Sequence, residues 1–556
     1  MSAPAISPAP RERDLNLLVA VVLLLAAFAV FYQVLGFDFV YDDRFYILEK
    51  DQVHQGITWE SVRWALTKTS EGSWHPTLWL LYITVYEFFG LNAQAFHGAI
   101  LLLHMANTLL LFFLLFRLTR ARMRSAFVAG LFALHPLHVE STAFVTGATD
   151  VLCFFFWLLA LHAYARWTGS KRFLWYGLCF GAYVLSCMSK AMAVTFPVTL
   201  LLLDFWPLGR FPARTGPPQG GKGESLPASA HGPWATAMRL VLEKIPFFLL
   251  ALVPAVMAVL ARQGAGSLVS TETVTTLERL QWTCVNYTHY LKKLFLPCNL
   301  AHIYPRGELP GWPWIGISAL VLLCITGMAL WGWRRAPFLA VGWLWYAATL
   351  SPVSGLVQYG YYAVADRYTY IPYTGLFVIL AWGAHALASR LRHGPGVAAV
   401  PGLAALAALA VVSHSQAAHW KNPITLNTHT VAVTENNGLA LSNLAASLLE
   451  AGRPEEAIPH FQAVLELNAD NPKALRGLGQ ALAMTGRWEP AKAALTRLLA
   501  LEPDNADAYN DLGIIAFQTK DLEGAKLFFQ KALELAPGHA LAKANLRHVE
   551  TMLDNQ

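Results

Sequence analysis

The sequence predicts an all-α fold, in which a polytopic transmembrane helical domain is followed by a C-terminal solenoid of helical repeats. Three observations support this prediction. Of the 556 residues, 55% are hydrophobic and only 14% are charged, whereas a soluble domain carries about 25% charged residues. Carboxylates are concentrated in the last 120 residues, while long stretches between residues 15 and 414 carry none. From residue 438 onward, apolar residues recur with a period of 34 residues.

The charge and cysteine patterns argue against several classes of function. The formal net charge is only +6, and the basic residues form short clusters between apolar runs. This pattern does not favour nucleic-acid binding. The six cysteines form no CxxC pair and show no spacing typical of metal ligands. We interpret them as core residues, because free cysteine is readily buried: Cys153, Cys179, Cys187, Cys284, Cys298 and Cys324.

The first predicted span begins after a Pro-rich tail. Residues 1–14 contain Arg11 and Arg13, and an uncharged apolar run extends from Leu15 to Leu35. At about 1.5 Å per residue, this run crosses a bilayer. No Ala-x-Ala cleavage site follows it, so we expect a retained helix rather than a signal peptide. Ten further spans, for eleven in all, are expected at residues 95–116, 125–145, 149–166, 172–188, 191–206, 245–262, 312–333, 337–357, 370–389 and 397–414.

Basic clusters predict the orientation of these spans, since Lys and Arg favour the cytoplasmic ends of short loops. Such clusters follow the second, fourth, eighth and tenth spans, on the same side as Arg11 and Arg13. The N-terminus is therefore expected in the cytoplasm, and an odd number of spans places the repeats on the extracytoplasmic side. A bacterial inner membrane with periplasmic repeats is favoured, and the endoplasmic reticulum is the alternative.

Three segments between the spans have their own character. Residues 207–235 are rich in Pro and Gly, and we expect a cytoplasmic linker there. Residues 76–90 and 276–298 are apolar but amphipathic or interrupted, so we expect interfacial helices within extracytoplasmic loops. If either of these two segments spans the membrane instead, the orientation of part of the chain reverses.

The period of 34 residues is that of tetratricopeptide repeats. Leu444, Leu478 and Leu512 occupy one phase of this period. Each repeat is expected to be a helical hairpin that packs on the next, with a last helix covering the open apolar face. The predicted domain comprises residues 437–556, with repeats at 438–471, 472–505 and 506–539 and a capping helix at 540–556.

Acidic residues and a histidine gather at the extracytoplasmic ends of the predicted spans. Asp42 and Asp43 lie in the first loop, and His138 and Glu140 lie at the end of the third span. An Asp pair can cap a helix or lie in a solvated loop. The alternative is a general base or a metal ligand beside the bilayer, since ionisable groups at this depth are functional candidates.

Two basic residues are predicted on that same side, against the usual bias. Lys190 and Arg367 would suit a lipid phosphate, although Arg367 could instead pair with Asp366. Together with the acids, they favour the transfer of a sugar from a membrane-anchored phosphate. A carboxylate would take the proton of the acceptor hydroxyl. The cationic side chains of Lys190 and Arg367 would stabilise the leaving phosphate. Aromatic residues expected in the same cavity are Trp74, Tyr359, Tyr361 and Tyr362.

Six motifs together have the pattern of a known family. They are Phe39-Val40-Tyr41-Asp42-Asp43, Trp74-His75-Pro76-Thr77-Leu78-Trp79, His135-Pro136-Leu137-His138-Val139-Glu140-Ser141, Ser189-Lys190, the run from Leu200 to Trp206 with Asp204, and Asp366-Arg367-Tyr368-Thr369-Tyr370. In these motifs the chain resembles the transmembrane and tetratricopeptide repeat containing O-mannosyltransferases and their bacterial relatives, glycosyltransferases of the GT-C type. The resemblance covers essentially the whole chain. It implies a GT-C-like transmembrane domain at residues 15–420, followed by the repeats.

The resemblance also implies roles for individual residues. Family members usually carry an acidic residue directly after the Ser-Lys pair, where this chain has Ala191. A second acid at that position is therefore not expected here. The implied roles are catalytic for Asp42 or Asp43, between which the sequence does not choose, acceptor-binding for His138 and Glu140, and donor-phosphate-binding for Lys190 and Arg367.

The function implied by the resemblance is sugar transfer with inversion. The donor would be a polyprenyl-phosphate-linked sugar, with mannose or another hexose passing to a Ser or Thr hydroxyl of a protein held by the repeats. A divalent metal is left open. One alternative is a non-catalytic membrane scaffold whose repeats organise an envelope or secretion complex. Another is a GT-C enzyme that acts on a lipid or a glycan. A transporter is disfavoured, because the hydropathy shows no inverted repeat.

Overall fold

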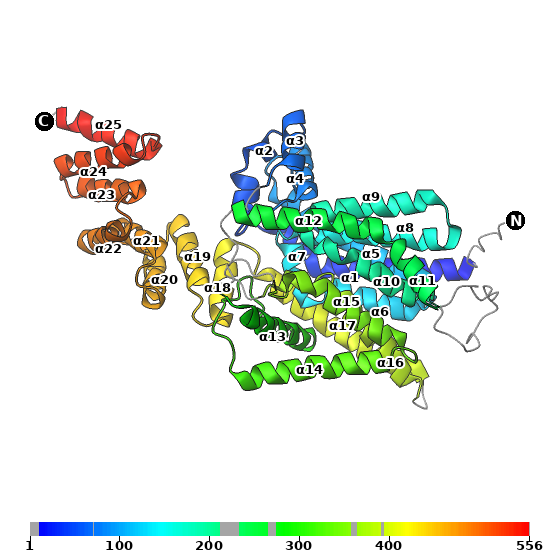
Figure 1. Cartoon of the computed structure of the whole chain (residues 1–556). Coiled ribbons are helices and arrows are strands. Elements are labelled where there is room, and N and C mark those ends of the chain that lie inside the picture. The colour runs from blue at the N-terminus through cyan, green and yellow to red at the C-terminus, as the bar shows by residue number, and fades with distance from the viewer. Residues whose placement is uncertain are drawn as a thin grey trace. The chain divides into compact units, whose positions relative to one another are not determined.

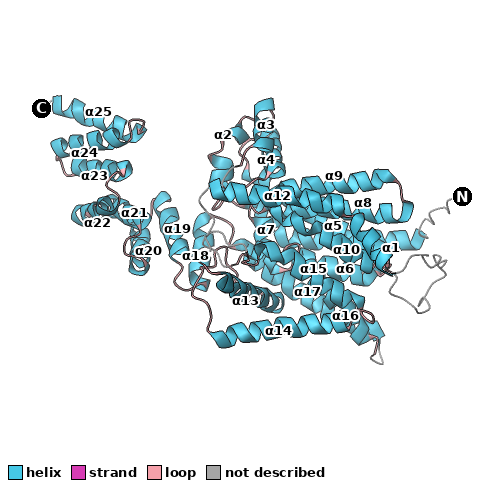
Figure 2. Cartoon of the chain, in the orientation of Figure 1, coloured by secondary structure: helices cyan, strands magenta, loops and turns pink. Residues whose placement is uncertain are grey.

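The computed structural model describes residues 10–69, 72–211, 233–264, 274–356, 364–390 and 394–554. Figure 2 shows helices joined by loops, and no strand occurs in these ranges. The predicted all-α fold is therefore confirmed. The chain divides into two compact units, one comprising Met1–His302 with Arg306–Asn422 and the other Ile303–Pro305 with Pro423–Gln556.

The first unit, called the membrane unit below, is a bundle of helices (Figure 1). Two central helices, α5 and α8, pack against each other, and α8 also forms a hairpin with α9. The helices up to α9 are α1 (Pro10–Phe31), α2 (Asp51–His54), α3 (Trp59–Thr67), α4 (Pro76–Phe89), α5 (Ala93–Thr119), α6 (Arg122–Leu134), α7 (Val139–Ala143), α8 (Ala148–Ser170) and α9 (Phe173–Ser189). The others are α10 (Phe196–Phe205), α11 (Pro233–Leu242), α12 (Ile245–Gly264), α13 (Thr276–Phe295), α14 (Trp312–Trp331), α15 (Pro337–Leu350), α16 (Tyr373–Ala388) and α17 (Gly394–Ala418).

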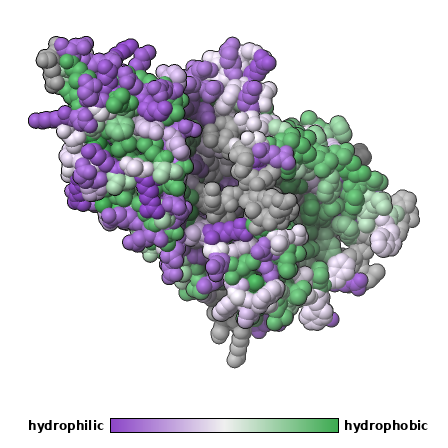
Figure 3. Space-filling model, turned by 60° about the vertical axis from the view of Figure 1, so that its left-hand side comes forward, coloured by the Kyte–Doolittle hydropathy of each residue, from purple (hydrophilic) through white to green (hydrophobic). Residues whose placement is uncertain are grey.

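Six helices among the described residues are long and apolar enough to cross a membrane. They coincide with predicted spans, and several of them expose large apolar side chains, such as Leu252 on α12 and Leu323 on α14. The visible face in Figure 3 accordingly carries a broad hydrophobic area. A surface of this kind suits lipid. The six segments are Arg13–Gly36, Ala93–Thr119, Ala148–Ser170, Ile245–Gly264, Trp312–Trp331 and Ala399–Ala418.

The other predicted spans correspond to shorter helices. The predicted span 125–145 is not one helix, because α6 ends before His135 and a 3-10 turn, Pro136–His138, leads into α7. Proline lacks a backbone N–H and disfavours helical backbone in the residue before it. Likewise, a 3-10 turn precedes α10 within the span predicted at 191–206. The count of eleven spans stays a prediction.

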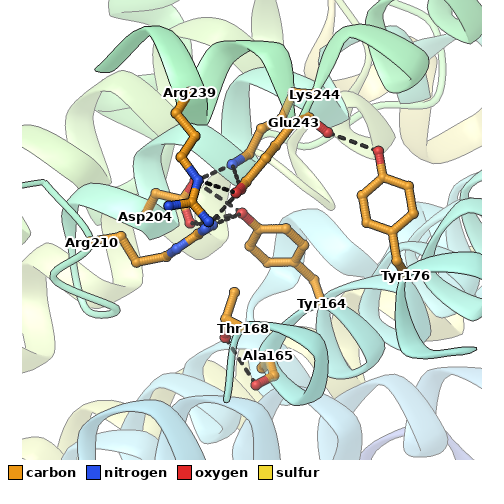
Figure 4. Close-up of polar contacts among 9 residues, drawn as sticks. All are labelled: Tyr164, Ala165, Thr168, Tyr176, Asp204, Arg210, Arg239, Glu243 and Lys244. Carbon is orange, nitrogen blue, oxygen red and sulfur yellow. Dashed lines mark hydrogen bonds and ion pairs between the residues drawn. The ribbon is translucent and has the colours of Figure 1, made fainter. Parts of the chain in front are cut away.

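A buried ion-pair network joins the ends of several helices in the membrane unit (Figure 4). Asp204, in the last turn of α10, accepts hydrogen bonds from the Tyr164 hydroxyl at 2.7 Å and from Arg210 Nη1 at 2.9 Å, and it also pairs with Lys244 Nζ. Arg210 Nη2 lies 2.7 Å from Glu243 Oε2. Arg210 and Glu243 flank the part of the predicted linker at residues 212–232, which lies outside the described residues. The network therefore fixes α10 and the chain entering α12 to α8.

This network provides a stability prediction. The side chains of Asp204 and Lys244 are fully buried, so removing one charge leaves the other underpaired in a low dielectric. We expect Lys244→Met to lower the free energy of unfolding by about 3–5 kcal/mol. The double variant Asp204→Asn with Lys244→Met should be less destabilised than the single one. Thermal unfolding of the detergent-solubilised protein measures both, and a single variant as stable as the wild type would contradict the expectation.

The second unit consists of helical hairpins at the predicted period. An asparagine caps the first helix of each repeat: the side chains of Asn437, Asn471 and Asn505 accept from the backbone N–H three residues on. A side chain at Gly513 would approach the Phe529 ring to 2.6 Å, so the paired helices require a residue without a side chain there. The helices are α18 (Pro423–Val433), α19 (Gly438–Glu450), α20 (Pro454–Leu467), α21 (Pro472–Met484), α22 (Trp488–Leu501), α23 (Ala506–Gln518), α24 (Leu522–Leu535) and α25 (Ala540–Asp554).

Candidate active site

The loop after α1 carries the two adjacent aspartates. Asp43 is fully buried. Its Oδ2 accepts from the Val40 backbone N–H at 3.0 Å, and its Oδ1 accepts from the backbone N–H and hydroxyl of Thr146 at 2.8 and 2.7 Å. Thr146 lies in the turn between α7 and α8. Asp43 therefore fastens the first loop to that turn, with both carboxylate oxygens engaged.

Asp42 differs from its neighbour in exposure, because it is only partly buried. The backbone at Tyr41 has φ of +52°, a left-handed conformation that costs a non-glycine residue roughly 1–2 kcal/mol. Such strain is often stored at functional sites. Of the two predicted catalytic residues, Asp42 is thus the one that a substrate can reach from the surface.

Burial shifts the pKa of Asp43, which lies outside the membrane-spanning segments. It raises the pKa of Asp43 to about 7, against the opposing effect of the hydrogen bonds from Thr146 and Val40. The folded protein consequently holds a proton between about pH 4 and pH 7 that the unfolded chain has lost. The stability from this proton is complete below the ordinary pKa and disappears as the pH rises through the folded one.

The pKa of Asp43 leads to a pH prediction. We expect the unfolding temperature of the wild type to fall by several degrees between about pH 5 and pH 8. Asp43→Asn should remove this part of the pH dependence, because the amide does not titrate. Asp51→Asn is a matched control, since Asp51 is exposed in the same loop region. Parallel pH profiles for wild type and Asp43→Asn would refute the assignment.

Lys190 and Arg367 are each paired with a buried carboxylate. Lys190 Nζ lies 2.6 Å from an oxygen of Asp150, in the first turn of α8. The Arg367 guanidinium pairs with Glu140 Oε1, and the Arg367 backbone N–H donates to Glu140 Oε2 at 2.9 Å. The carboxylate partner of Arg367 that the structure shows is thus Glu140, where the sequence had offered Asp366.

The two cations meet at one aromatic ring. Lys190 Nζ lies 5.3 Å from the ring centroid of Tyr368, and Arg367 Cζ lies 5.4 Å from it. Their side chains keep 14% and 22% of their surface exposed. Asp150 is four residues from Thr146, to which Asp43 is bonded. Asp43, Lys190 and Arg367 therefore all bind to the segment from α7 to the first turn of α8, at residues 140–150.

The sequence reasoning missed some residues of this cluster. Asp150 and Tyr368 were not predicted as site residues, although both lie in or beside the recognised motifs. His75 is a further addition: the Thr77 hydroxyl donates to Ser189 Oγ at 2.7 Å, so the His-Pro-Thr segment lies against Ser189 and Lys190. Burial and the charge of Lys190 lower the pKa of His75 to about 4, which keeps its imidazole neutral at physiological pH.

The remaining predicted site residues have other surroundings or fall outside the described residues. His138 is fully buried, its Nδ1 donates to the Phe132 carbonyl at 2.8 Å, and its ring packs beside Tyr370 and Phe377. It is part of the aromatic core and does not line the exposed cluster. Trp74 Nε1 donates to the Leu66 carbonyl at 3.2 Å. Tyr359, Tyr361 and Tyr362 lie outside the described residues.

A metal site is not assembled in the described part of the chain. No group of three or more His, Cys, Asp or Glu side chains there is arranged to hold a metal ion. Near the cluster, Asp43, Asp150 and Glu140 already bind Thr146, Lys190 and Arg367.

Comparison with known proteins covers both units. Profiles of the tetratricopeptide repeat family match residues 448–512 and 485–540. Protein O-mannosyl-transferase TMTC1 of Homo sapiens is 24% identical over 482 residues, which is 77% of this chain and 53% of the relative. TMTC4 of Mus musculus is 25% identical over 491 residues, which is 76% of this chain and 63% of the relative. The chain is similar to the TMTC proteins over about three quarters of its length.

The TMTC likeness confirms the resemblance inferred from the six motifs. Protein O-mannosyl-transferase Tmtc2 of Drosophila melanogaster is 30% identical over 196 residues, which is 32% of this chain and 20% of the relative. The chain spans between about half and two thirds of the length of the TMTC1 and TMTC4 relatives. As the sequence predicts, the chain itself combines helices that are long and apolar enough to cross a membrane with tetratricopeptide repeats.

Proposed function

We propose that this chain is an integral membrane glycosyltransferase that moves a sugar from a polyprenyl phosphate to a Ser or Thr hydroxyl of a protein. The sugar is mannose or another hexose, and the reaction takes place on the extracytoplasmic side. The observation that supports this best is the pair of cations at Tyr368, beside the turns that hold the aspartate loop. The names of the TMTC relatives agree with it.

The mechanism follows from which side chains are accessible. Asp42 acts as the general base and takes the proton of the acceptor hydroxyl as that oxygen attacks the anomeric carbon. The bond from this carbon to the phosphate oxygen breaks, and the phosphate leaves with the bonding pair. A single displacement of this kind inverts the anomeric centre.

Lys190 and Arg367 stabilise the phosphate as its charge develops. Asp150 and Glu140 hold these two cations in place through the ion pairs described above. Each cation still has N–H groups to donate, since an ammonium has three and a guanidinium has five. Asp43 does not touch the substrate in this scheme and instead positions the loop that carries Asp42.

In this proposal, the repeats bind the acceptor protein and hold it for the reaction. Arrays of this type form extended concave surfaces that bind other chains. Within the repeats, Arg476 is already bound by Asp507 at 2.7 Å and by Asp511 at 2.9 Å. The charge of this arginine is therefore already balanced by carboxylates of the next repeat.

Incubation of the purified protein with polyprenyl-phosphate sugars and an acceptor polypeptide tests the proposal. Transfer that disappears in the variant Asp42→Asn with Asp43→Asn would support an enzyme. Absence of transfer by the wild type would favour the non-catalytic scaffold, and unchanged transfer by the variant would refute the catalytic role assigned to the aspartates.

Removal of residues 437–556 distinguishes protein from lipid or glycan acceptors. If the repeats hold a polypeptide, the truncated protein should glycosylate protein at least about tenfold more slowly, because the repeats no longer raise the effective concentration of the acceptor. It should still bind the donor. The measurement is transfer of radiolabelled sugar to protein and to lipid, in parallel. Glycolipid product that persists, without protein product from either form, would establish the lipid or glycan alternative.

A further inference from the structure

An exposed apolar patch lies on the segment between α1 and α5. Single exposed apolar residues are common, whereas a contiguous group of large ones marks a contact surface. We call this group the loop patch. It consists of Ile57, Trp59, Phe88, Phe89 and Leu91, with exposed fractions of 52%, 74%, 71%, 63% and 47%.

Two contacts join the parts of the loop patch. The Ile57 backbone N–H donates to Glu87 Oε2 at 2.9 Å. His54 stacks on Tyr86 with ring centroids 5.3 Å apart. The chain from His54 to Ile57 therefore runs along the last turn of α4, and the aromatic pair that ends α4 adjoins the start of α3.

Folding of the membrane unit does not require the loop patch to be buried. The inner face of α3 is already packed, since Ser61 and Ala65 are buried and the Trp64 ring lies 4.9 Å from that of Trp79. Trp59 points away from this face, and the exposed Arg63 lies one helical turn further on. An aromatic residue beside a basic one on an exposed helix face is typical of helices that lie on a membrane.

The place of the loop patch in the fold identifies its partner. Leu91 lies two residues before Ala93, the first residue of the span candidate Ala93–Thr119. Figure 1 shows α2, α3 and α4 together at one end of the bundle, with α4 running across the direction of α8 and α9. If α8 crosses the bilayer, α4 lies along its surface. We propose that the loop patch inserts into the interfacial layer of the bilayer, at the level where α5 enters it.

The chemistry of the loop patch favours lipid over a protein partner. Its five members carry no charge, and the neighbouring carboxylate of Glu87 is bonded to the Ile57 backbone. Trp rings are enriched at the interface between water and hydrocarbon, and Phe and Leu side chains are common on the apolar face of helices that lie in this interface.

Membrane contact at this patch has a consequence for the site, which rests on the proposed function. The N-terminal end of α4 lies beside the site, where the Thr77 hydroxyl donates to Ser189 Oγ. In the middle of α4, the Tyr82 hydroxyl donates to the Val145 carbonyl at 2.8 Å. The 14 residues of α4 extend over about 21 Å. A bilayer contact at Phe88 and Phe89 would thereby fix the depth of Lys190 at the level of lipid phosphates.

Spin labels measure the depth of the loop patch directly. Trp59→Cys and Phe88→Cys would be labelled in nanodiscs, with Cys284, Cys298 and Cys324 replaced by Ser because they are the cysteines that are not buried. Glu60→Cys is the matched control on α3. Labels at 59 and 88 should collide more with oxygen than with a water-soluble nickel complex, and the label at 60 should show the reverse. Higher accessibility of these labels to nickel than to oxygen would overturn the proposal. So would spectral broadening of the labels that grows with protein concentration, because it would indicate contact between protein molecules at this patch.

An activity measurement separates this inference from the proposed function. The variant Trp59→Ser, Phe88→Ser and Phe89→Ser should fold as the wild type does, because these side chains are exposed. We expect its KM for a long-chain polyprenyl donor in liposomes to rise by about tenfold, since interfacial anchoring is lost, while a short-chain soluble donor is used normally. An equal KM for the long-chain donor contradicts the role in positioning. If the wild type transfers sugar from neither donor, the proposed function fails, and the spin labels still decide the membrane contact.

Discussion

Substitution of Asp42 by Asn is expected to lower the rate of sugar transfer by about 10²–10⁴-fold, the range that a positioned general base contributes. The amide is nearly isosteric but does not accept the proton of the acceptor hydroxyl. Donor binding should change little, because the donor phosphate is assigned to Lys190 and Arg367. The comparison to make is kcat for transfer against the affinity for polyprenyl phosphate, measured on the same preparation.

Asp43→Asn and Asp51→Asn are the controls for this experiment. Asp43 is buried and bonded to Thr146, so its substitution should alter loop stability and the pH dependence described above. Asp51 is exposed at the start of α2, and its substitution should leave activity unchanged. If Asp43→Asn abolishes transfer without a change in the unfolding temperature, and Asp42→Asn remains active, the two roles are exchanged.

Substitution of Arg367 by Met has the second large effect. We expect kcat to fall by about 10²–10³-fold, because a preorganised donor to the leaving group is lost. The same change leaves Glu140 buried at 3% exposure without its cation, which also destabilises the fold. Activity loss alone would therefore not separate the two causes.

A double variant resolves this ambiguity. Arg367→Met with Glu140→Gln removes the unpaired charge, and it should recover much of the unfolding temperature. Its transfer rate should remain low, since the phosphate still lacks the guanidinium. Lys190→Met with Asp150→Asn is the matching test for the other cation. Recovery of transfer together with stability in either double variant would show that the cation has only a structural role.

Much of the fold could be predicted because its signals are local. Leu15 to Leu35 is apolar over the thickness of a bilayer, and Leu444, Leu478 and Leu512 recur at one phase of a known repeat. Helix breaks were harder to predict. His135 and Pro136 lie inside an apolar run, yet the backbone requirement of proline ends α6 there.

The candidate site was predicted as a set of residues without their partners. The sequence indicated that Asp43, Glu140, Lys190 and Arg367 belong to one side of the membrane. It contained no signal that His138 would be enclosed by aromatic rings, because a histidine within an apolar motif suits both a site and a core.

The sequence by itself determined the classes of structure: an apolar helical domain, a period of 34 residues and a set of ionisable residues at helix ends. Only the tertiary structure decided which of those residues meet. Glu140 and Arg367 are 227 positions apart, Asp43 and Thr146 are 103 apart, and Asp150 and Lys190 are 40 apart. The physical reason is that hydropathy and period report on neighbours along a helix, whereas these pairs form where helices pack and leave buried charges to find a partner.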